Sequence, residues 1–161
     1  MIVVQTNSEA ETASFAARLA ARIREAIDRS ELEWIVIGLS GALGAGKTAF
    51  VRGFVSALDP VWGTQVTSPS YAIAQHYATR PPVRHLDLYR LTTLEDLEAI
   101  GYRELYFAPG VALVEWIETV AEAIPSEWLE ISLAVDPTDV REIRVRPHGA
   151  RLERIVRGVS G

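Results

Sequence analysis

The segment that constrains this chain most is a continuous apolar run followed by a glycine-rich turn and an amphipathic helix. Residues 34–39 have the length of a strand and no polar alternation, which is typical of a strand covered on both faces of a parallel sheet. Residues 41–48 form the turn, and apolar residues at helical spacing follow as far as Leu58. A strand, a turn and a helix in this order predict one unit of an α/β fold.

The turn reads Gly-Ala-Leu-Gly-Ala-Gly-Lys-Thr, which matches at every position the pattern of glycine, four residues, Gly-Lys and then Ser or Thr. Glycines let successive backbone amides point into one concavity, and the helix that follows adds the positive end of its dipole. Such a turn suits a triphosphate, with Lys47 on the β and γ phosphates and the Thr48 hydroxyl on magnesium. The alternative is a glycine-rich turn that contains Gly-Lys-Thr by chance, and the flanking strand and helix argue against it. The expected contacts with the nucleotide are Gly41, Ala42, Leu43, Gly44, Ala45, Gly46, Lys47, Thr48 and Ala49.

Length and composition limit the kinds of protein that this chain can be. The 161 residues allow one domain, which we expect to span residues 1–161. The chain has no cysteine, which excludes disulfides, thiolate metal sites and a cysteine nucleophile, and it favours the reducing cytoplasm. A formal charge of -5 disfavours unaided binding to nucleic acid. Neither a signal peptide nor an apolar run long enough for a membrane span is visible.

Strand and helix patterns alternate along the rest of the chain. Ser8 and Glu11 are spaced to cap a first helix that runs to about Arg29, and Thr92 and Glu95 are spaced to cap a short helix that stops at Gly101. Further strands are expected at residues 2–4, 71–77, 83–88, 111–114, 129–135 and 142–145, with a helix at 117–124. The last two strands form a hairpin through residues 136–139, and residues 149–161 fit a strand or a helix equally well.

These elements predict an α/β fold: a three-layer sandwich like that of P-loop NTPases, with a mainly parallel central sheet, flanking helices and a C-terminal antiparallel hairpin.

Two carboxylates follow expected strands and are candidates for the metal or for positioning water. Glu115 ends the apolar run 111–114, and Asp87 ends the strand at 83–88. Each could instead be an ordinary cap or surface carboxylate, but the phosphate turn favours a functional role for both. Residues 67–71, which include Ser70, carry hydroxyls that could sense a γ phosphate or simply form a polar turn. Histidines at 76, 85 and 148 lack metal-ligand spacing and are expected to be structural.

Four motifs in this order resemble one family. They are the turn at 41–48, Thr-Ser-Pro-Ser-Tyr at 67–71, His-Leu-Asp-Leu-Tyr-Arg-Leu at 85–91 and Leu-Val-Glu-Trp at 113–116. Together they are similar to the TsaE family, formerly YjeE, over residues 5–145. The family commonly has threonine where this chain has Ser70.

The resemblance implies a magnesium-dependent ATPase, weak on its own, that acts with the TsaB–TsaD complex. That complex makes threonylcarbamoyladenosine at adenosine 37 of tRNA, and ATP hydrolysis would permit its repeated turnover, with tRNA met only through the complex. Carried over by position, Lys47, Asp87 and Glu115 would be catalytic, and Thr48 and Glu115 would hold magnesium with help from Asp87. Ser70, Glu9 and Arg141 would contact the nucleotide, the last two at its base and sugar. Glu9 could instead favour the helix dipole, and Arg141 could be an exposed strand residue.

Two other functions fit the phosphate turn. A small-molecule P-loop kinase has a similar length, but it needs an arginine-bearing lid, and Arg84, Arg90 and Arg103 do not form a lid-like run. A binding module with incidental hydrolysis would tolerate the loss of Lys47 or of either carboxylate.

Overall fold

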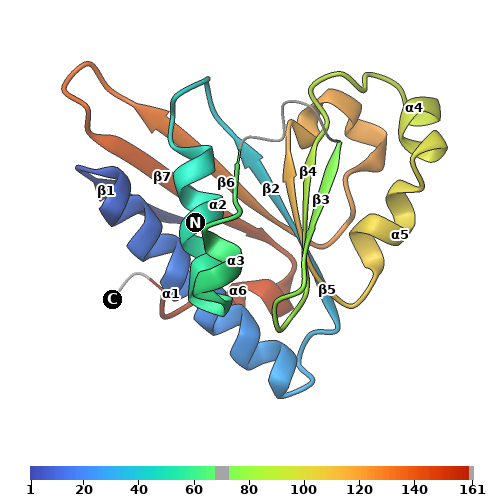
Figure 1. Cartoon of the computed structure of the whole chain (residues 1–161), viewed down its shortest axis with the longest axis horizontal. Helices are drawn as coiled ribbons and strands as arrows, with labels where there is room; N and C mark the ends of the chain where they lie inside the picture. The colour runs from blue at the N-terminus through green and yellow to red at the C-terminus, as the bar shows by residue number, and fades with distance from the viewer. Residues whose placement is uncertain (68–72, 160–161) are drawn as a thin grey trace.

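A computed structural model of the chain describes residues 1–67 and 73–159 (Figure 1). In chain order the elements are β1 (Ile2–Thr6), α1 (Glu9–Asp28), β2 (Trp34–Ser40), α2 (Lys47–Leu58), α3 (Pro60–Gly63), β3 (Ala74–Tyr77), β4 (Val83–Asp87), α4 (Leu94–Ala99), α5 (Tyr102–Phe107), β5 (Gly110–Glu115), the 3-10 helix η1 (Ile117–Ala123), β6 (Trp128–Val135), β7 (Arg141–His148) and α6 (Ala150–Val156). Within the described residues, every helix is too short or too polar to cross a membrane.

The described strands form one seven-stranded sheet in the order β1-β7-β6-β2-β5-β4-β3. Strand β2 is central and pairs in parallel with β5 and with β6, and β5 pairs in parallel with β4. The pairs β1–β7, β6–β7 and β3–β4 are antiparallel. The expectation of a mainly parallel sheet is therefore wrong: the sheet is mixed, with a parallel centre. Strands joined by a short turn, such as β3 and β4, can pair only antiparallel.

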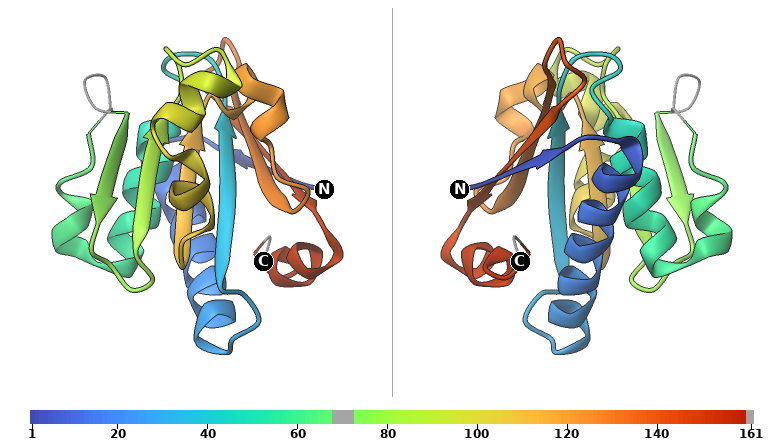
Figure 2. Two further views of the ribbon diagram at one scale, coloured as in Figure 1. Left: turned by 90° about the vertical axis from the view of Figure 1, so that its right-hand side faces the viewer. Right: turned by 90° about the vertical axis from the view of Figure 1, so that its left-hand side faces the viewer.

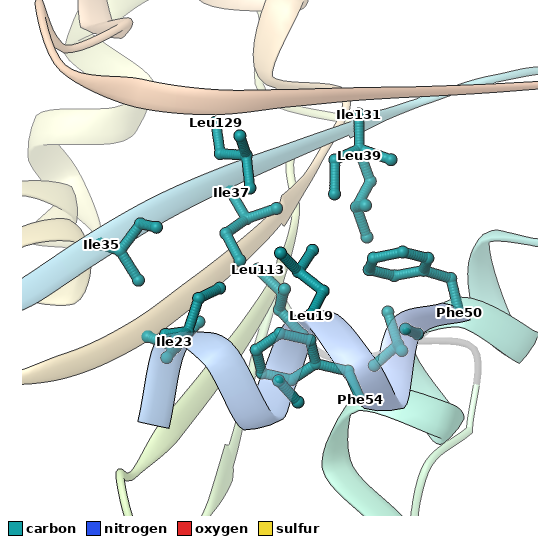
Figure 3. Packing of buried hydrophobic residues seen from close by; sticks show 14 of the residues in the cluster. Leu19, Ile23, Ile35, Ile37, Leu39, Phe50, Phe54, Leu113, Leu129 and Ile131 are labelled. Carbon is teal, nitrogen blue, oxygen red and sulfur yellow. The ribbon is translucent and has the colours of Figure 1, made fainter. Parts of the chain in front are cut away.

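Helices cover both faces of the central strands, so the α/β class and the three layers are confirmed. Alternate residues of β2 supply the two cores, because successive side chains in a strand point to opposite faces. On one face, Ile35, Ile37 and Leu39 pack with α1 and α2 (Figure 3). On the other face, Val36 packs with apolar residues of α4, α5 and η1. Figure 2 shows the two helical layers from opposite sides, with α4 and α5 nearer in its left view and α1 nearer in its right view.

The expected hairpin of β6 and β7 is confirmed, while several helix boundaries differ from expectation. Ser8 accepts from the Glu11 N–H at 3.1 Å, but the Glu11 carboxylate accepts from Asn7 instead of Ser8. The capping box of α4 uses Thr93 and Asp96, one residue beyond the expected pair Thr92 and Glu95.

Three other segments also depart from expectation, and the structure decides the tail that was left open. Helix α4 ends at Ala99, shortly before Gly101 as expected. Helix α5 follows directly after Gly101 and was not expected from the sequence. The helix expected at residues 117–124 is a 3-10 helix, interrupted at Val120 by non-helical backbone. Of the strand expected at residues 71–77, β3 covers Ala74–Tyr77 and Ile73 lies in a bend, while residues 71–72 lie outside the described residues. The undecided C-terminal tail contains α6.

Arg84 joins β4 to the end of α5 through three hydrogen bonds. Its guanidinium donates to the carbonyl oxygens of Leu105, Ala108 and Pro109 at 2.6, 2.8 and 3.0 Å. The side chain is buried, and burial lowers the pKa of its guanidinium. Arg84 thus ties the last turn of α5 and the two residues after it to β4, which gives it a structural role.

Gly53 sets how closely α1 and α2 pack, and replacing it tests this contact. A Cβ at Gly53 would lie 2.4 Å from the backbone oxygen of Ala13 and 2.5 Å from its Cα, so the helices would have to move apart. Helix propensity alone predicts that Gly53→Ala stabilises the protein by about 1 kcal/mol. We expect the opposite sign, a loss of about 2 kcal/mol in the free energy of unfolding, because overpacking dominates. Urea denaturation measures this change, and a stabilised variant would contradict the close approach.

Candidate functional site

The glycine-rich turn joins β2 to α2 at the carboxyl end of the central strand (Figure 1). Gly44 and Gly46 have φ values of 82° and 104°, a left-handed region that costs other residues steric strain. Gly41 has a φ of 147°, and a Cβ there would meet the Leu133 carbonyl oxygen of β6 at 2.5 Å. These glycines therefore allow the loop to pack closely against β6. The first amides of α2 have no hydrogen-bond partners within the helix, as at the start of any α-helix.

Lys47 is the first residue of α2, and its side chain returns over the loop. Its Nζ donates to the carbonyl oxygens of Gly41 and Ala42, the latter at 3.2 Å. The same atom lies 5.4 Å from the centre of the Trp116 ring. Lys47 is only 9% exposed, and it is the single lysine of the chain. Its ammonium is thus fixed in the loop, and the half-buried Thr48 follows it in the first turn of the helix.

The two candidate carboxylates lie next to each other. Asp87 ends β4, Glu115 ends β5, and the two residues are register partners in adjacent parallel strands. Glu115 is in turn the partner of Leu39, one residue before the end of β2. The loop, Asp87 and Glu115 thus share the carboxyl edge of the parallel strands, which is where open α/β sheets bind ligands.

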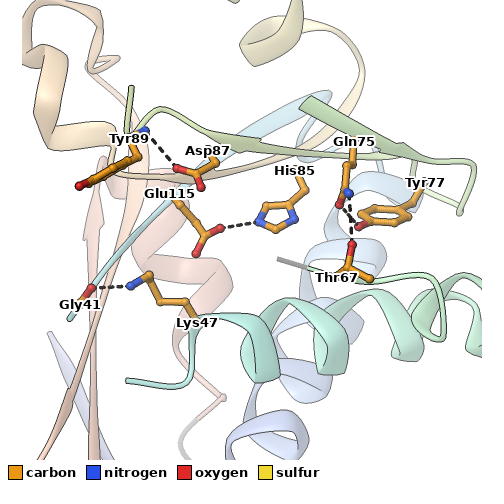
Figure 4. Close-up of polar contacts among 9 residues, drawn as sticks. All are labelled: Gly41, Lys47, Thr67, Gln75, Tyr77, His85, Asp87, Tyr89 and Glu115. Carbon is orange, nitrogen blue, oxygen red and sulfur yellow. Dashed lines mark hydrogen bonds and ion pairs between the residues drawn. The ribbon is translucent and has the colours of Figure 1, made fainter. Parts of the chain in front are cut away.

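The two carboxylates have different surroundings. Glu115 is 6% exposed, and one of its oxygens, Oε2, lies 2.9 Å from Nε2 of His85 (Figure 4). Asp87 is half-buried, and its Oδ1 accepts from the Tyr89 N–H at 3.0 Å. Burial raises the pKa of the Asp87 carboxyl, and the charge of Glu115 adds to the rise. The Tyr89 N–H, the His85 ring and the Lys47 ammonium oppose this rise in the pKa without cancelling it.

The raised pKa of Asp87 predicts a stability cost that depends on pH. An acid whose pKa is higher in the folded than in the unfolded protein destabilises the fold once it ionises, so the cost is absent at low pH and grows as pH rises through the two values. We therefore expect Asp87→Asn to raise the melting temperature at pH 7 and to leave it unchanged near pH 3. Thermal unfolding of both proteins at the two pH values measures this, and a lower melting temperature of the variant at pH 7 would contradict it.

Trp116 lies beside Lys47, and Tyr89 packs against Trp116. Trp116 follows Glu115 directly and has a φ of 61°, which is uncommon for a bulky residue and costs backbone strain. Hydrogen bonds hold this conformation, because Thr119 donates to the Trp116 carbonyl through both its N–H and its hydroxyl. The Trp116 ring lies 5.3 Å from the ring of Tyr89, which is 63% exposed. The strained backbone of Trp116 thus places its ring beside Lys47 and against the ring of Tyr89.

Of the three further expected contacts, Arg141 lies near the loop. A Cβ at Gly46 would lie 3.7 Å from both Cδ and Nε of Arg141, and the buried Nε of Arg141 has no hydrogen bond within the described residues. Glu9 is exposed in the first turn of α1, and no contact joins it to the loop in the described part of the chain. Ser70 lies outside the described residues.

His85 contacts the candidate site through Glu115, and this contact was not predicted from the sequence. Its contact with Glu115 joins residues 30 positions apart through neighbouring strands, which no local pattern reveals. The one available signal was its position two residues before Asp87, on the same face of the strand.

Comparison with known proteins decides the family. The sequence model of the family described as threonylcarbamoyl adenosine biosynthesis protein TsaE matches residues 6–143. This chain belongs to the TsaE family. The matched span contains the loop, both carboxylates, His85 and Arg141.

Individual relatives agree with this assignment. A TsaE protein of Treponema pallidum is 41% identical over 113 residues, which are 70% of this chain and 82% of that protein. A TsaE protein of Bacillus subtilis is 36% identical over 126 residues, which are 78% of this chain and 77% of that protein. The crystal structure of Bacillus subtilis YdiB superposes with a TM-score of 0.76 at 29% identity, covering 99% of this chain and 93% of that one. The resemblance to TsaE proteins that the four motifs indicated is therefore confirmed.

Proposed function

We propose that this protein binds and hydrolyses ATP with magnesium, and that it serves the synthesis of threonylcarbamoyladenosine in tRNA. The observation that carries the first half is the juxtaposition of the phosphate loop, the buried Lys47 and two carboxylates at one sheet edge. Membership of the TsaE family supports the second half. We accordingly interpret the fold as a P-loop NTPase-like domain. We also propose that the protein acts in the cytoplasm.

The residues present fit a magnesium nucleotide. Magnesium is held in such sites by one or two protein oxygens together with phosphates and waters, and dedicated protein cages are uncommon. Among the described residues, no three histidine or acidic side chains gather as a metal cage, which agrees with this mode of binding. Thr48, Glu115 and Asp87 would hold the ion, and the loop through Ala49 would hold the phosphates. Arg141, with its buried Nε beside Gly46, would face the sugar or base, and we keep Glu9 and Ser70 as further contacts to test.

The chain's own groups would act in three ways during hydrolysis. Lys47 places a positive charge where negative charge develops on the γ phosphate, and the loop amides add preorganised donors. Glu115 or Asp87 orients the attacking water, and the other holds the metal side of the site. Bound magnesium would neutralise charge on the β and γ phosphates. The buried positions of Lys47 and Glu115 strengthen these electrostatic effects, since they lie in a region of low dielectric.

The partner proposed for this ATPase is the TsaB–TsaD complex, which would meet the tRNA in its place. A chain with a formal charge of -5 has no overall basic field with which to bind tRNA directly. Hydrolysis would reset the complex between turnovers.

Steady-state hydrolysis with and without the complex tests the proposal. We expect slow magnesium-dependent release of phosphate by the protein alone and a clear stimulation by TsaB–TsaD. Transfer of the γ phosphate to a small acceptor, without stimulation by the complex, would instead support the kinase alternative. Arg84 counts against that alternative, because it is buried and each of its three nitrogens already donates to a carbonyl at or just after the end of α5.

A further inference from the structure

His85 and Glu115 form a buried pair across neighbouring strands. His85 is 1% exposed in β4, and its Nε2 lies 2.9 Å from Oε2 of Glu115 in β5. In the register of the two strands His85 lies opposite Leu113, so the Glu115 side chain reaches back along the sheet to meet the ring. Figure 4 shows the Glu115 carboxylate directed toward His85, with Lys47 on the same side of the sheet.

A buried carboxylate needs such a partner. Removing a charged group from water is costly unless hydrogen bonds compensate for the lost hydration. Glu115 accepts only from His85 through its side chain among the described residues, and that bond uses a single oxygen, Oε2. The bond restricts the rotation of the carboxylate and leaves Oε1 for the ligand side of the site.

We propose that His85 is a positioning residue, whose Nε2–H donates to Glu115 Oε2 and thereby aims Oε1 at the magnesium nucleotide. The inference rests on the proposed function, because it assigns Glu115 to the ion or its water. Partners in the second shell of metal sites commonly change metal affinity or activity by about 10–100-fold when they are removed. In this proposal His85 makes no contact with the nucleotide or the ion: it acts through its bond to Glu115, beside its effect on the pKa of Asp87.

The chain contains a matched control for this pair. His148 of β7 contacts Glu130 of β6 through the same atoms, Nε2 and Oε2, at the same 2.9 Å. That pair is half-exposed, stacks on Trp128, and lies in the antiparallel hairpin away from Asp87 and Glu115. Replacing His148 removes an equivalent bond without touching the candidate site.

Calorimetric titration of a non-hydrolysable ATP analogue, with magnesium and with EDTA, tests the proposal through binding alone. Glutamine places its amide nitrogen near the position of Nε2, whereas asparagine is too short to reach Oε2. We expect His85→Asn to lose about 10-fold or more of the affinity gained with magnesium, and to keep its affinity in EDTA. His85→Gln should retain most of the gain, and His148→Asn should retain all of it. Equal losses in the glutamine and asparagine variants, or none in the asparagine variant, would overturn the inference.

Kinetics and spectroscopy supply independent readouts. We expect His85→Asn to lower kcat by about 10–100-fold and to raise the KM for magnesium ATP in step with its weaker binding, because KM approaches the dissociation constant when chemistry is slow. In nitrogen-15 spectra of the nucleotide-free protein, with the His85 signals assigned by their loss in His85→Gln, Nε2 should carry a proton. A bare Nε2 would overturn the inference, since the bond could not then run from His85 to Glu115. Wild-type protein without any magnesium-dependent binding of nucleotide would contradict the proposed function itself, an outcome distinct from a failure of the His85 variants alone.

Discussion

Replacing Lys47 with alanine is expected to lower the kcat of ATP hydrolysis by about 10³-fold, because one buried cation is removed from the point where phosphate charge develops. No other lysine exists in the chain to take its place. The side chain is 9% exposed and already fixed by the carbonyls of Gly41 and Ala42, so its charge is preorganised. Phosphate release under saturating ATP, with and without the TsaB–TsaD complex, measures the loss.

The control for Lys47 is a cation outside the site. Arg103 is exposed and pairs with Glu98 at 2.8 Å, so Arg103→Ala removes a positive charge without touching the loop. We expect its kcat to match that of the wild type, and we expect Lys47→Ala to unfold cooperatively. A Lys47→Ala protein that hydrolyses ATP as fast as the Arg103→Ala control would exclude the proposed role of the lysine.

Replacing Glu115 with glutamine is expected to give the second largest effect, a loss of about 10²-fold or more in kcat. The amide is nearly isosteric and can still accept from His85 through its oxygen, so the fold should persist. Binding of nucleotide in EDTA should be unchanged, since the phosphate loop is intact. Measuring kcat and the affinity gained with magnesium separates a role in catalysis from a role in folding.

A parallel Asp87→Asn variant assigns the two carboxylates. The variant that loses kcat and keeps the magnesium-dependent gain in affinity identifies the residue that orients water, and the variant that loses both identifies the residue on the metal side. Glu130→Gln is the control, because Glu130 also pairs with a histidine but lies in the hairpin. Full activity in both Glu115→Gln and Asp87→Asn would contradict the assignment of either residue to catalysis.

The parts of the fold that local sequence specifies were predictable. The unit of β2, loop and α2 follows from an apolar run, glycines and a helical stripe, and the β6–β7 hairpin follows from its turn. The order of the strands was not predictable, because the pairing of β1 with β7 joins the two ends of the chain. Helix α5 was missed because Gly101 reads as a stop, although the chain turns there and begins a new helix.

Part of the candidate site could likewise be predicted from local sequence, and part could not. The loop, Lys47 and Thr48 form one contiguous motif, and Asp87 and Glu115 each end a strand, so sequence could nominate all of them. The bond between His85 and Glu115 depends on which strands are neighbours and on their register, which only the folded sheet defines. The residue that caps α4 could not be chosen from local sequence either. Two adjacent threonines each have an acid three residues later, and the structure uses Thr93.

We propose that the nucleotide site drives repeated tRNA modification, and counting the modified adenosines formed per complex tests this. Wild-type protein or the Lys47→Ala variant is mixed with limiting TsaB–TsaD complex, substrate tRNA and ATP, and the threonylcarbamoyladenosine formed per complex is counted. We expect many modified adenosines per complex with wild-type protein and no more than a single round with Lys47→Ala. Repeated turnover supported equally by a folded Lys47→Ala variant that still binds the complex would contradict the claim and would indicate a binding module with incidental hydrolysis.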